Sequence, residues 1–383
     1  MKAEIKYVDE AVQHFKELLI NQIERQEKMA EGRCRKDFSS KDKIVIGLIG
    51  GDGIGPFIME SAVRVLKELL ADELLSGKVE LRTIEGLTIA NRLEKNKSVP
   101  DEVLAEIKKC DVILKGPTET PKGGSMESAN VTLRRELDLF ANVRPVRIDS
   151  EGIDWVFFRE NTEGEYVLGS KGIEIPDTLT MDFKVTTVSG TERIARAAFD
   201  YAKNNGKNSV SIVTKANIMK KTDGRFSEIC HKVAEEYPQI TAEDWYIDIM
   251  TANLVNTSIR SKFQVFVLPN LYGDIITDEA AQIQGGVGTA GSANIGDNYA
   301  MFEAIHGTAP RLIEEGKSAY ANPLSILKAV CLMLRHIGYA EKAEKLDCVL
   351  EKCTADGNHS GFTGDTDGIT GKELCDNIIA EIN

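Results

Sequence analysis

The sequence is short of positive charge. Its 383 residues include 47 lysines and arginines against 60 aspartates and glutamates, so the formal net charge is −13 at pH 7. A surface of that sign repels nucleic-acid phosphates and anionic lipid headgroups. The sequence also lacks a stripe of basic residues. We therefore expect a protein that binds neither nucleic acid nor membranes.

Three further absences narrow the class of protein. No apolar run approaches the roughly 18 residues that cross a bilayer. The first residues include Glu4, Asp9 and Glu10, whereas secretory signals have an apolar stretch and transit peptides avoid acids. The seven cysteines form no Cys-x-x-Cys pair, so neither a disulfide framework nor a zinc site is indicated. We expect a cytoplasmic, globular protein with reduced thiols and two or three domains.

A recurring order of strand, turn and helix indicates an α/β fold. Short apolar runs rich in β-branched residues suit strands that are buried on both faces. Residues 58–70 then have helical periodicity, and residues 8–23 predict an amphipathic helix before a charged linker at 31–43. The predicted strands are 44–49, 111–114, 210–213 and 265–268.

The glycines after the first strand do not form a dinucleotide fingerprint. Gly51, Gly53 and Gly55 begin such a pattern, but a Gly-x-Gly-x-x-Gly motif needs a third glycine where this sequence has Pro56. We interpret the segment as a tight turn between strand and helix. A nicotinamide cofactor, if one binds, need not occupy a Rossmann crevice.

Three arginines lie in or beside apolar sequence. Arg134, Arg144 and Arg159 carry permanent charges that are costly to bury without anionic partners. They indicate a pocket for a polycarboxylate or a phosphate. Structural salt bridges are the alternative, and the acids nearby in sequence are Glu136, Asp138 and Glu160.

Two further segments have ligand-binding character. Asp274 and Asp278 share one face if their segment is helical, and hard divalent cations prefer such oxygen ligands. A solvated helix face is the alternative interpretation. The second segment is rich in small residues and runs from Gly285 to Pro310, where His306 could hydrogen-bond to or stack on a base. A structural histidine is the alternative there.

These residues lie in longer blocks that resemble the β-decarboxylating dehydrogenases, which act on isocitrate, isopropylmalate or homoisocitrate. The resemblance runs from about residue 44 to residue 340, and the blocks follow the family's order. The blocks are 50–56 (GGDGIGP), 115–117 (KGP), 133–145 (LRRELDLFANVRP), 159–166 (RENTEGEY), 215–220 (KANIMK), 270–278 (NLYGDIITD) and 306–310 (HGTAP).

The resemblance implies a non-Rossmann α/β fold and a domain division. A large domain would contain residues 44–139 and 285–383, and a small domain residues 140–284. A clasp near 164–188 would join two subunits into a homodimer. Residues 1–43 lie before the resemblance, and we expect them to form an N-terminal helical extension and linker that packs onto the large domain or onto a second dimer, with a regulatory partner as a further alternative.

The resemblance also implies an active site shared between subunits, with Lys215 and Asp248 supplied by the partner. Asp248 lies in a strand-like setting in the sequence. Mg²⁺ or Mn²⁺ would polarise the substrate, Lys215 would remove a proton and Tyr166 would return one. The implied residues are Tyr166 and Lys215 for catalysis; Thr120, Ser128, Asn130, Arg134, Arg144 and Arg159 for the substrate; Asp248, Asp274 and Asp278 for the metal; and Glu303, His306, Gly307, Thr308, Ala309, Arg311 and Asn322 for the cofactor.

The segment before Arg134 bears on the choice of substrate. Family members that use isocitrate have Ser-x-Asn here, and Ser128 and Asn130 match it. Members that use isopropylmalate have a glutamate and a leucine pair; Glu127 matches the glutamate, but Asn130 and Val131 replace the leucines. We expect isocitrate, with isopropylmalate or homoisocitrate as the alternative.

The cofactor is less clearly indicated. NADP-type members have Lys-Tyr after the HGTAP block, and NAD-type members have an acid and an isoleucine. This chain has Arg311 and Leu312. We favour NAD, with NADP as the alternative. A non-catalytic regulatory subunit is a further alternative, but such subunits usually lose the ligand and proton-transfer residues that are present here.

Overall fold

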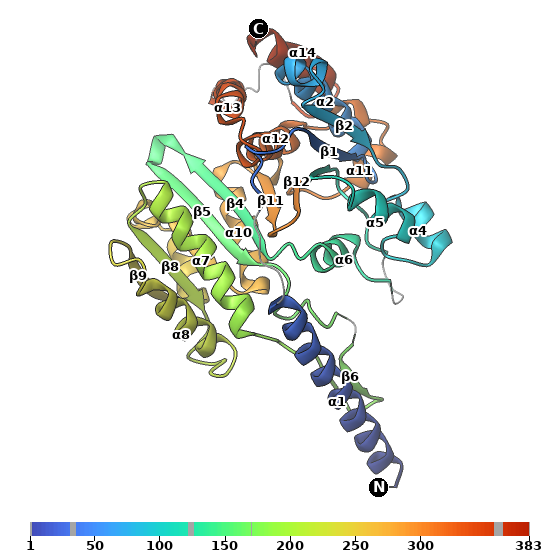
Figure 1. Cartoon of the computed structure of the whole chain (residues 1–383), viewed down its shortest axis with the longest axis vertical. Helices are drawn as coiled ribbons and strands as arrows, with labels where there is room; N and C mark the ends of the chain where they lie inside the picture. Colours follow the sequence, from blue (N-terminus) through green and yellow to red (C-terminus); the bar gives the residue numbers. More distant parts are fainter. Residues whose placement is uncertain (1, 31–35, 122–125, 170, 356–362, 383) are drawn as a thin grey trace. The chain divides into compact units, whose positions relative to one another are not determined.

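The computed structural model describes residues 2–30, 36–121, 126–169, 171–355 and 363–382. The chain divides into two compact units (Figure 1). The large unit consists of residues 35–148 and 278–383, and the small unit of residues 1–34 and 149–277. Residues 31–35 of the predicted linker lie outside the described residues.

The large unit is built on a mixed sheet. Its strands lie in the order β2-β1-β3-β12-β11-β4, with the first four parallel and β11 antiparallel to both of its neighbours. The predicted strand at 44–49 is confirmed, and the one at 111–114 is shifted by one residue. The bounds are β1 Ile44–Ile49, β2 Val79–Thr83, β3 Val112–Lys115, β4 Ala141–Ile148, β11 Gly291–Ile295 and β12 Ala300–Ala304.

Helices cover both faces of this sheet. Alternate residues of a strand point to opposite sides, so β1 contributes side chains to two cores. Ile46 and Leu48 of β1 pack in one core with α2, α12, α13 and α14. Ile49 packs in the other core with α5 and α6. The helices of this unit are α2 Gly55–Leu69, α3 Ala71–Leu75, α4 Ile89–Lys95, α5 Asp101–Ile107, α6 Ala129–Glu136, α11 Pro310–Glu314, α12 Leu324–His336, α13 Ala340–Ala355 and α14 Gly371–Ile382.

The small unit has four parallel strands in the order β5-β10-β8-β9. Phe157 and Phe266 stack at its centre with ring centroids 4.3 Å apart, and Trp155 meets Phe266 edge-on. The bounds are β5 Ile153–Glu160, β8 Ser209–Thr214, β9 Thr241–Tyr246, β10 Val265–Leu268, α7 Val188–Asn204, α8 Asp223–Ala234 and α9 Ile247–Val255. Helix α10, Asn270–Gln284, follows β10, and short 3₁₀ turns lie at Asp149–Glu151, Arg260–Lys262, Val287–Thr289 and Ser318–Tyr320.

A small hairpin lies within the segment predicted to be a clasp. Its strands, β6 (Ile173–Ile175) and β7 (Leu179–Met181), pair in antiparallel fashion. Leu179 and Met181 are exposed. The pairing of this hairpin with a second subunit remains a prediction.

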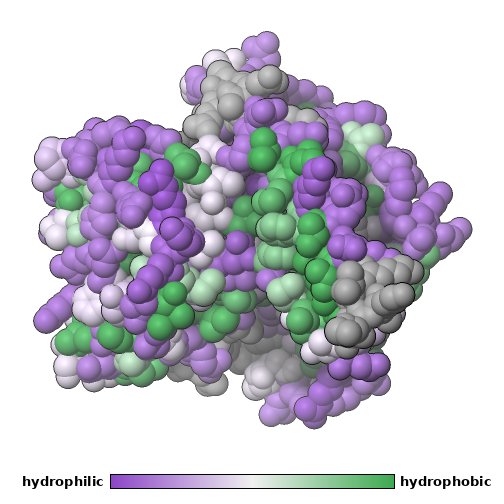
Figure 2. Space-filling view, turned by 90° about the horizontal axis from the view of Figure 1, so that it is seen from below, coloured by the Kyte–Doolittle hydropathy of each residue, from purple (hydrophilic) through white to green (hydrophobic). Residues whose placement is uncertain are grey.

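The N-terminal helix α1 spans Lys2–Ala30, which is longer than the predicted 8–23. It contacts β6 and α7 of the small unit. Its packing onto the large domain or onto a second dimer remains a prediction. Part of its apolar face stays exposed, including Val8, Val12 and Ile23. Figure 2 shows apolar side chains at the surface among hydrophilic ones.

The unit boundaries differ from the predicted domain boundaries at 139/140 and 284/285. The structure divides the chain at 148/149 and 277/278. Strand β4 explains the first difference, because it pairs with β11 through Ala141, Asn142 and Val143 and so belongs to the large unit. Among the described helices, none is long and apolar enough to cross a membrane.

The glycine turn after β1 packs against two other loops of the large unit. The amide of Asp52 donates to the carbonyl of Pro117 at 2.8 Å, and the amide of Ile54 donates to the carbonyl of Thr308 at 3.1 Å. A Cβ added at Gly116 would overlap the carbonyl oxygen of Gly50. These glycines serve backbone-to-backbone packing, which supports interpreting the segment as a tight turn.

This packing predicts that Gly116→Ala is destabilising. A methyl group there must displace backbone rather than a flexible side chain. We expect the free energy of unfolding to fall by about 1–3 kcal/mol. The measurement is urea unfolding followed by circular dichroism.

Gly224→Ala is the matched control, because a Cβ at this helical position meets nothing within 4 Å. We expect that substitution to be neutral or stabilising by about 0.4–1 kcal/mol. Equal losses in both variants would contradict the packing argument.

Candidate active site

In the small unit, the Asp274 carboxylate contacts two other predicted site residues, Arg159 and Tyr166. Arg159 is the penultimate residue of β5, has 1% of its side chain exposed, and pairs with Asp274 on α10. Its Nε and Nη2 donate to Oδ1 of Asn270 at 3.0 and 2.7 Å. The Tyr166 hydroxyl donates to the other oxygen of Asp274 at 2.8 Å. Arg159, Tyr166 and Asp274 therefore form one cluster.

Lys215 and Asp248 form a second cluster in the small unit. The Lys215 Nζ lies 2.6 Å from Oδ1 of Asp248, and this hydrogen bond lowers the pKa of the Asp248 carboxyl. The strand-like setting expected for Asp248 is wrong, because β9 ends at Tyr246 and Asp248 lies in the first turn of α9. Acids are favoured in that turn by the helix dipole. The backbone amide of Lys215 donates to the carboxylate of buried Asp223 at 2.7 Å, which fixes the backbone where the loop after β8 begins.

In the large unit, Arg134 belongs to a buried charge network. Glu303, which is 5% exposed, lies 3.3 Å from both the Arg134 Nη2 and the Lys115 Nζ. It also accepts a 2.8 Å hydrogen bond from Asn294. The structure places the Glu303 carboxylate beside these cations, and its predicted role in binding the cofactor remains a prediction. Burial lowers the pKa of Lys115.

Arg144 and Asp278 are a second pair in the large unit, with Nη1 and Oδ1 3.0 Å apart. Asp278 follows Asp274 by one helical turn of α10, as the spacing predicted. The carboxylate oxygens of Asp274 and Asp278 suit a hard divalent cation. No group of three potential metal-ligating side chains occurs among the described residues. The joint role of Asp248, Asp274 and Asp278 therefore remains a prediction that involves a second subunit.

The segment before α6 holds the residues predicted to select the substrate. The Glu127 carboxylate accepts from both Arg135 terminal nitrogens, at 3.0 and 2.8 Å, and from the Thr132 hydroxyl at 3.0 Å. Ser128 occupies the N-cap position of α6. The Asn130 Oδ1 accepts from the Thr118 hydroxyl at 3.2 Å, which assigns the Asn130 NH₂ group as the donor for other partners.

Thr120 is exposed in the loop that leads toward this segment. Buried Arg92 supports that loop by donating to the carbonyl groups of Glu119 and Glu127 at 2.6 and 3.4 Å. Thr120 and Ser128 are thus carried by backbone that one buried guanidinium ties together.

The predicted cofactor loop follows β12. His306 Nδ1 donates to the Gly307 carbonyl at 3.0 Å, and burial lowers the pKa of this histidine, so its ring is neutral at pH 7. The buried Nε2 has no hydrogen-bond partner among the described residues, which leaves one acceptor for a ligand. Thr308 and Ala309 continue the loop, with Ala309 at a φ of 46°. A neutral acceptor beside Gly307, where a Cβ would meet nothing within 4 Å, suits the predicted binding of a nucleotide base.

The remaining two predicted cofactor residues have local partners. Arg311 has 86% of its side chain exposed and pairs with Glu315 at 2.5 Å. The Asn322 Oδ1 accepts from the Leu324 amide at 2.9 Å at the start of α12. Arg311 is thus an exposed cation with a carboxylate partner one helical turn away.

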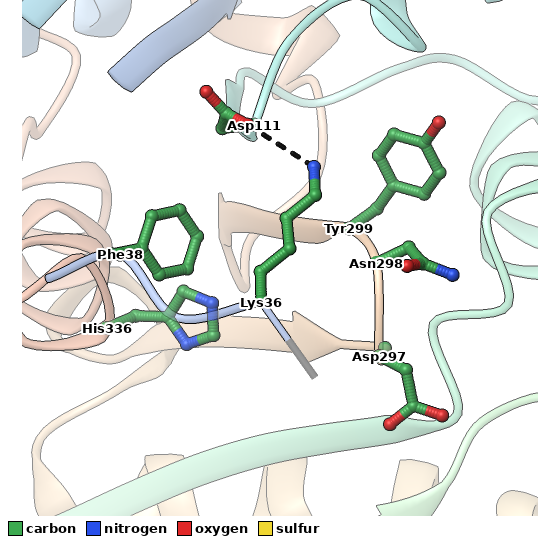
Figure 3. Close-up of a pocket in the computed structure, with 8 residues that line it drawn as sticks. Lys36, Phe38, Asp111, Asp297, Asn298, Tyr299 and His336 are labelled. Carbon is green, nitrogen blue, oxygen red and sulfur yellow. Dashed lines mark hydrogen bonds and ion pairs between the residues drawn. The ribbon is translucent and has the colours of Figure 1, made fainter. Parts of the chain in front are cut away.

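A small hollow also lies in the large unit, at the turn between β11 and β12 (Figure 3). Lys36 points at Asp111 across it with an Nζ–Oδ1 distance of 3.2 Å, and the Phe38 ring lies beside His336 with centroids 5.3 Å apart. Two of the hollow's charged residues, Lys36 and Asp111, are thus paired with each other. Its residues therefore fasten the segment after residue 35 to the large unit.

The turn between Arg159 and Tyr166 contains two buried acids whose roles the sequence did not indicate. The amides of Thr162 and Glu163 donate to the Glu160 carboxylate at 2.6–3.0 Å. Burial, followed by the charge of Glu163, raises the pKa of Glu160 to about 7. Arg193 lies close, donating to the Thr162 hydroxyl at 2.9 Å. An acid followed by threonine two positions later is the one sequence signal that could have predicted this turn.

Comparison with known proteins is decisive here. The family model described as "Isocitrate/isopropylmalate dehydrogenase" matches residues 45–382. This chain belongs to that family. The dehydrogenase fold is also that of "isocitrate dehydrogenase from Methylococcus capsulatus", a crystal structure with a TM-score of 0.78, 34% identity, and coverage of 88% of this chain and 99% of that one.

Relatives in the isocitrate/isopropylmalate dehydrogenase family carry several names. "Isocitrate dehydrogenase [NADP]" of Rickettsia typhi is 39% identical over 86% of this chain and 67% of its own length. "Isocitrate dehydrogenase [NAD] catalytic subunit 5, mitochondrial" of Arabidopsis thaliana is 38% identical over 91% and 92%. "3-isopropylmalate dehydrogenase" of Archaeoglobus fulgidus is 40% identical over 84% and 94%. The chain spans about two thirds of the length of the Rickettsia enzymes that it matches, 63% to 67%.

Lys115 is a further candidate for the site, and the sequence indicated it only as part of a block. It ends strand β3 in an apolar run, and its side chain is fully buried beside Glu303. A lysine at the carboxyl end of a buried parallel strand was the available signal.

The raised pKa of Glu160 predicts a pH-dependent stability. The folded protein holds a proton on Glu160 up to about pH 7, whereas an unfolded glutamate loses it near its ordinary value of 4.5. The free energy of unfolding therefore falls as pH rises through that window. We expect Glu160→Gln to remove about 1–3 kcal/mol of this fall between pH 5 and pH 8.

Urea unfolding at a series of pH values measures this effect. Glu228→Gln, on the exposed side of α8, should leave the wild-type pH dependence intact. A Glu160→Gln profile parallel to the wild type would show that the Glu160 pKa is not raised.

Proposed function

We propose that this chain catalyses the metal-dependent oxidative decarboxylation of isocitrate to 2-oxoglutarate and carbon dioxide, with reduction of a nicotinamide cofactor. The observation that carries the choice of substrate is the position of Glu127. Arg135 binds its carboxylate with both terminal nitrogens, so this residue is part of a salt bridge. The main argument for isopropylmalate is thereby weakened.

Ser128 and Asn130 suit a third carboxylate. Both carry hydrogen-bond donors at the start of α6, where the helix dipole also favours an anion. Thr118 occupies the Asn130 carbonyl oxygen, so the amide group is oriented for donation. A substrate with an apolar group there would leave these donors unpaired, at a cost of about 1–3 kcal/mol each.

The three arginines would bind the other carboxylates of isocitrate. Each is already fixed by a partner in its own unit: Arg134 by Glu303, Arg144 by Asp278 and Arg159 by Asn270. Fixed guanidinium groups lose little conformational freedom when substrate binds, and they orient the reacting carbon toward the cofactor.

Mg²⁺ or Mn²⁺ would be held by Asp274 and Asp278 together with Asp248 of the partner subunit in a homodimer. The cation would supply Lewis acidity at the substrate hydroxyl and at the carbonyl that replaces it. Lys215, also from the partner, would accept the hydroxyl proton. Tyr166 would return a proton after carbon dioxide leaves, and Asp274 orients its hydroxyl from 2.8 Å.

We favour NAD as the cofactor, with His306 as acceptor for the base and Gly307, Thr308, Ala309 and Asn322 around it. Arg311 supports this choice because its charge is paired with Glu315. Lys317, the next cation along the chain, is likewise paired with Glu315 and Asp365. The 2′-phosphate of NADP would have to compete with these acids.

Substrate and cofactor preference can be measured in one grid. We expect reduced-nicotinamide absorbance to rise with isocitrate and NAD in the presence of Mn²⁺. Isopropylmalate would leave the donors of Ser128 and Asn130 unpaired. We therefore expect kcat/KM for isocitrate to exceed that for isopropylmalate by roughly 30-fold or more.

The same grid contains the contradicting outcomes. A higher kcat/KM with isopropylmalate would mean that Glu127 leaves Arg135 when substrate binds. A higher value with NADP would mean that Arg311 leaves Glu315. Turnover in no cell of the grid would favour the regulatory-subunit alternative.

The two proton-transfer roles predict different defects. Lys215→Met should lower hydride transfer by about 100-fold or more, because the hydroxyl then has no base. Tyr166→Phe should spare hydride transfer and slow the later protonation. Single-turnover absorbance measures the first step, and solvent deuterium incorporation into 2-oxoglutarate measures the second.

Lys203→Met, a change of the same type at the end of α7, is the control for Lys215→Met. Wild-type hydride transfer in Lys215→Met, or an equal defect in both steps for Tyr166→Phe, would be incompatible with these roles.

A further inference from the structure

Both the N-terminal and the C-terminal half of helix α1 pack against other segments of the small unit. In the first half, the His14 Nε2 lies 3.0 Å from the Lys171 carbonyl oxygen, and the Phe15 ring lies 5.2 Å from the Phe183 ring. Lys171 and Phe183 flank the β6–β7 hairpin. The helix is therefore docked along the hairpin before it reaches the site.

The second half of α1 reaches the turn that carries the site residues. Arg25 donates to the Thr162 carbonyl at 3.1 Å, and its other terminal nitrogen lies 3.6 Å from the Glu163 carboxylate. One residue on, Gln26 is hydrogen-bonded to Ser189 at the start of α7. The Arg25 guanidinium thus contacts both the backbone of the turn and the buried Glu163 carboxylate.

Glu163 connects this contact to the catalytic cluster. Its carboxylate is 2% exposed, and it accepts a hydrogen bond from the Thr187 amide at 2.9 Å. Its carbonyl accepts from the Asn270 Nδ2 at 3.0 Å. The Oδ1 of the same Asn270 side chain holds Arg159, which in turn pairs with Asp274. A continuous path of contacts runs from α1 to the partner of Tyr166.

The charges of the turn explain why a cation is needed there. Glu160 and Glu163 are both buried within it, and the charge of Glu163 adds to the effect of burial that raises the pKa of Glu160. Removing one partner of a buried charge leaves the other without compensation, which is costly. Arg25 and Arg193 approach the turn from two different helices, α1 and α7.

We propose that Arg25 of α1 is a positioning residue for the reaction: it clamps the turn 160–166 so that Arg159 and Tyr166 stay on Asp274. This inference rests on the proposed function for its catalytic consequence. The N-terminal helix then acts on the reaction through the turn 160–166 of its own subunit.

The test is Arg25→Ala in the full chain. We expect kcat for isocitrate to fall about 3- to 30-fold, at most roughly the energy of one charge-assisted hydrogen bond, with a smaller change in the KM for the cofactor. Hydrogen–deuterium exchange gives a second measurement that needs no activity. Exchange across 160–166 should become about tenfold faster, because the turn that holds the Thr162 and Glu163 amides on Glu160 loses its contacts with Arg25, while β8 keeps its wild-type exchange.

Two variants isolate the role of the guanidinium. Lys16→Ala removes the same charge from an exposed position of the same helix, so both measurements should stay within about twofold of wild type. Arg25→Lys keeps the charge but loses the planar fork, so kcat should lie between the wild type and Arg25→Ala. If Arg25→Ala does not fold, Arg25→Lys carries the test through the same two measurements.

The outcomes separate this inference from the proposed function. Wild-type kcat and wild-type exchange in Arg25→Ala would overturn the clamp. Faster exchange across 160–166 with unchanged kcat would overturn its positioning role. If the wild type turns over no substrate of the grid, the proposed function fails by itself, and exchange across 160–166 still decides whether Arg25 holds the turn.

Discussion

The burial of Arg159 is the constraint on which the small unit's site depends. A guanidinium cannot give up its charge, and at 1% exposure it has little water to solvate it. Asn270 and Asp274 supply the missing partners, and both come from the start of α10, directly after β10. The pairing between β5 and β10 thus places a cation and its acceptors at one end of the small unit's sheet.

The large unit meets the same constraint with a network rather than a pair. Lys115 and Arg134 share the carboxylate of Glu303, and Asn294 donates to it as well. Such a network orients its members, although the buried Arg134 Nε has no hydrogen-bond partner among the described residues. The glycine turn after β1 adds backbone contacts to the loops that follow β3 and β12. Substrate and cofactor residues therefore stand on backbone that has little freedom to move.

Glu127 and Arg311 show how far local sequence can be interpreted. Both were ambiguous because a charged side chain in a motif can face a ligand or a neighbour. Arg135 binds Glu127 from eight residues away, and Glu315 binds Arg311 across one helical turn. Asp248 was misplaced for a related reason, because the boundary between β9 and α9 falls two residues before it. Helix and strand boundaries depend on tertiary packing that a short window of sequence does not contain.

Sequence alone determined the α/β class, the tight glycine turn and the family, because these follow from periodicity, backbone conformation and blocks of residues in a constant order. It also indicated which arginines and aspartates needed partners, since unpaired charges are costly to bury. Only the tertiary structure decided which partner each one has. It also decided that α1 packs on the small unit and that Arg25 reaches Glu163, 138 positions along the chain. Contacts of that range depend on how the elements pack, and no local pattern encodes them.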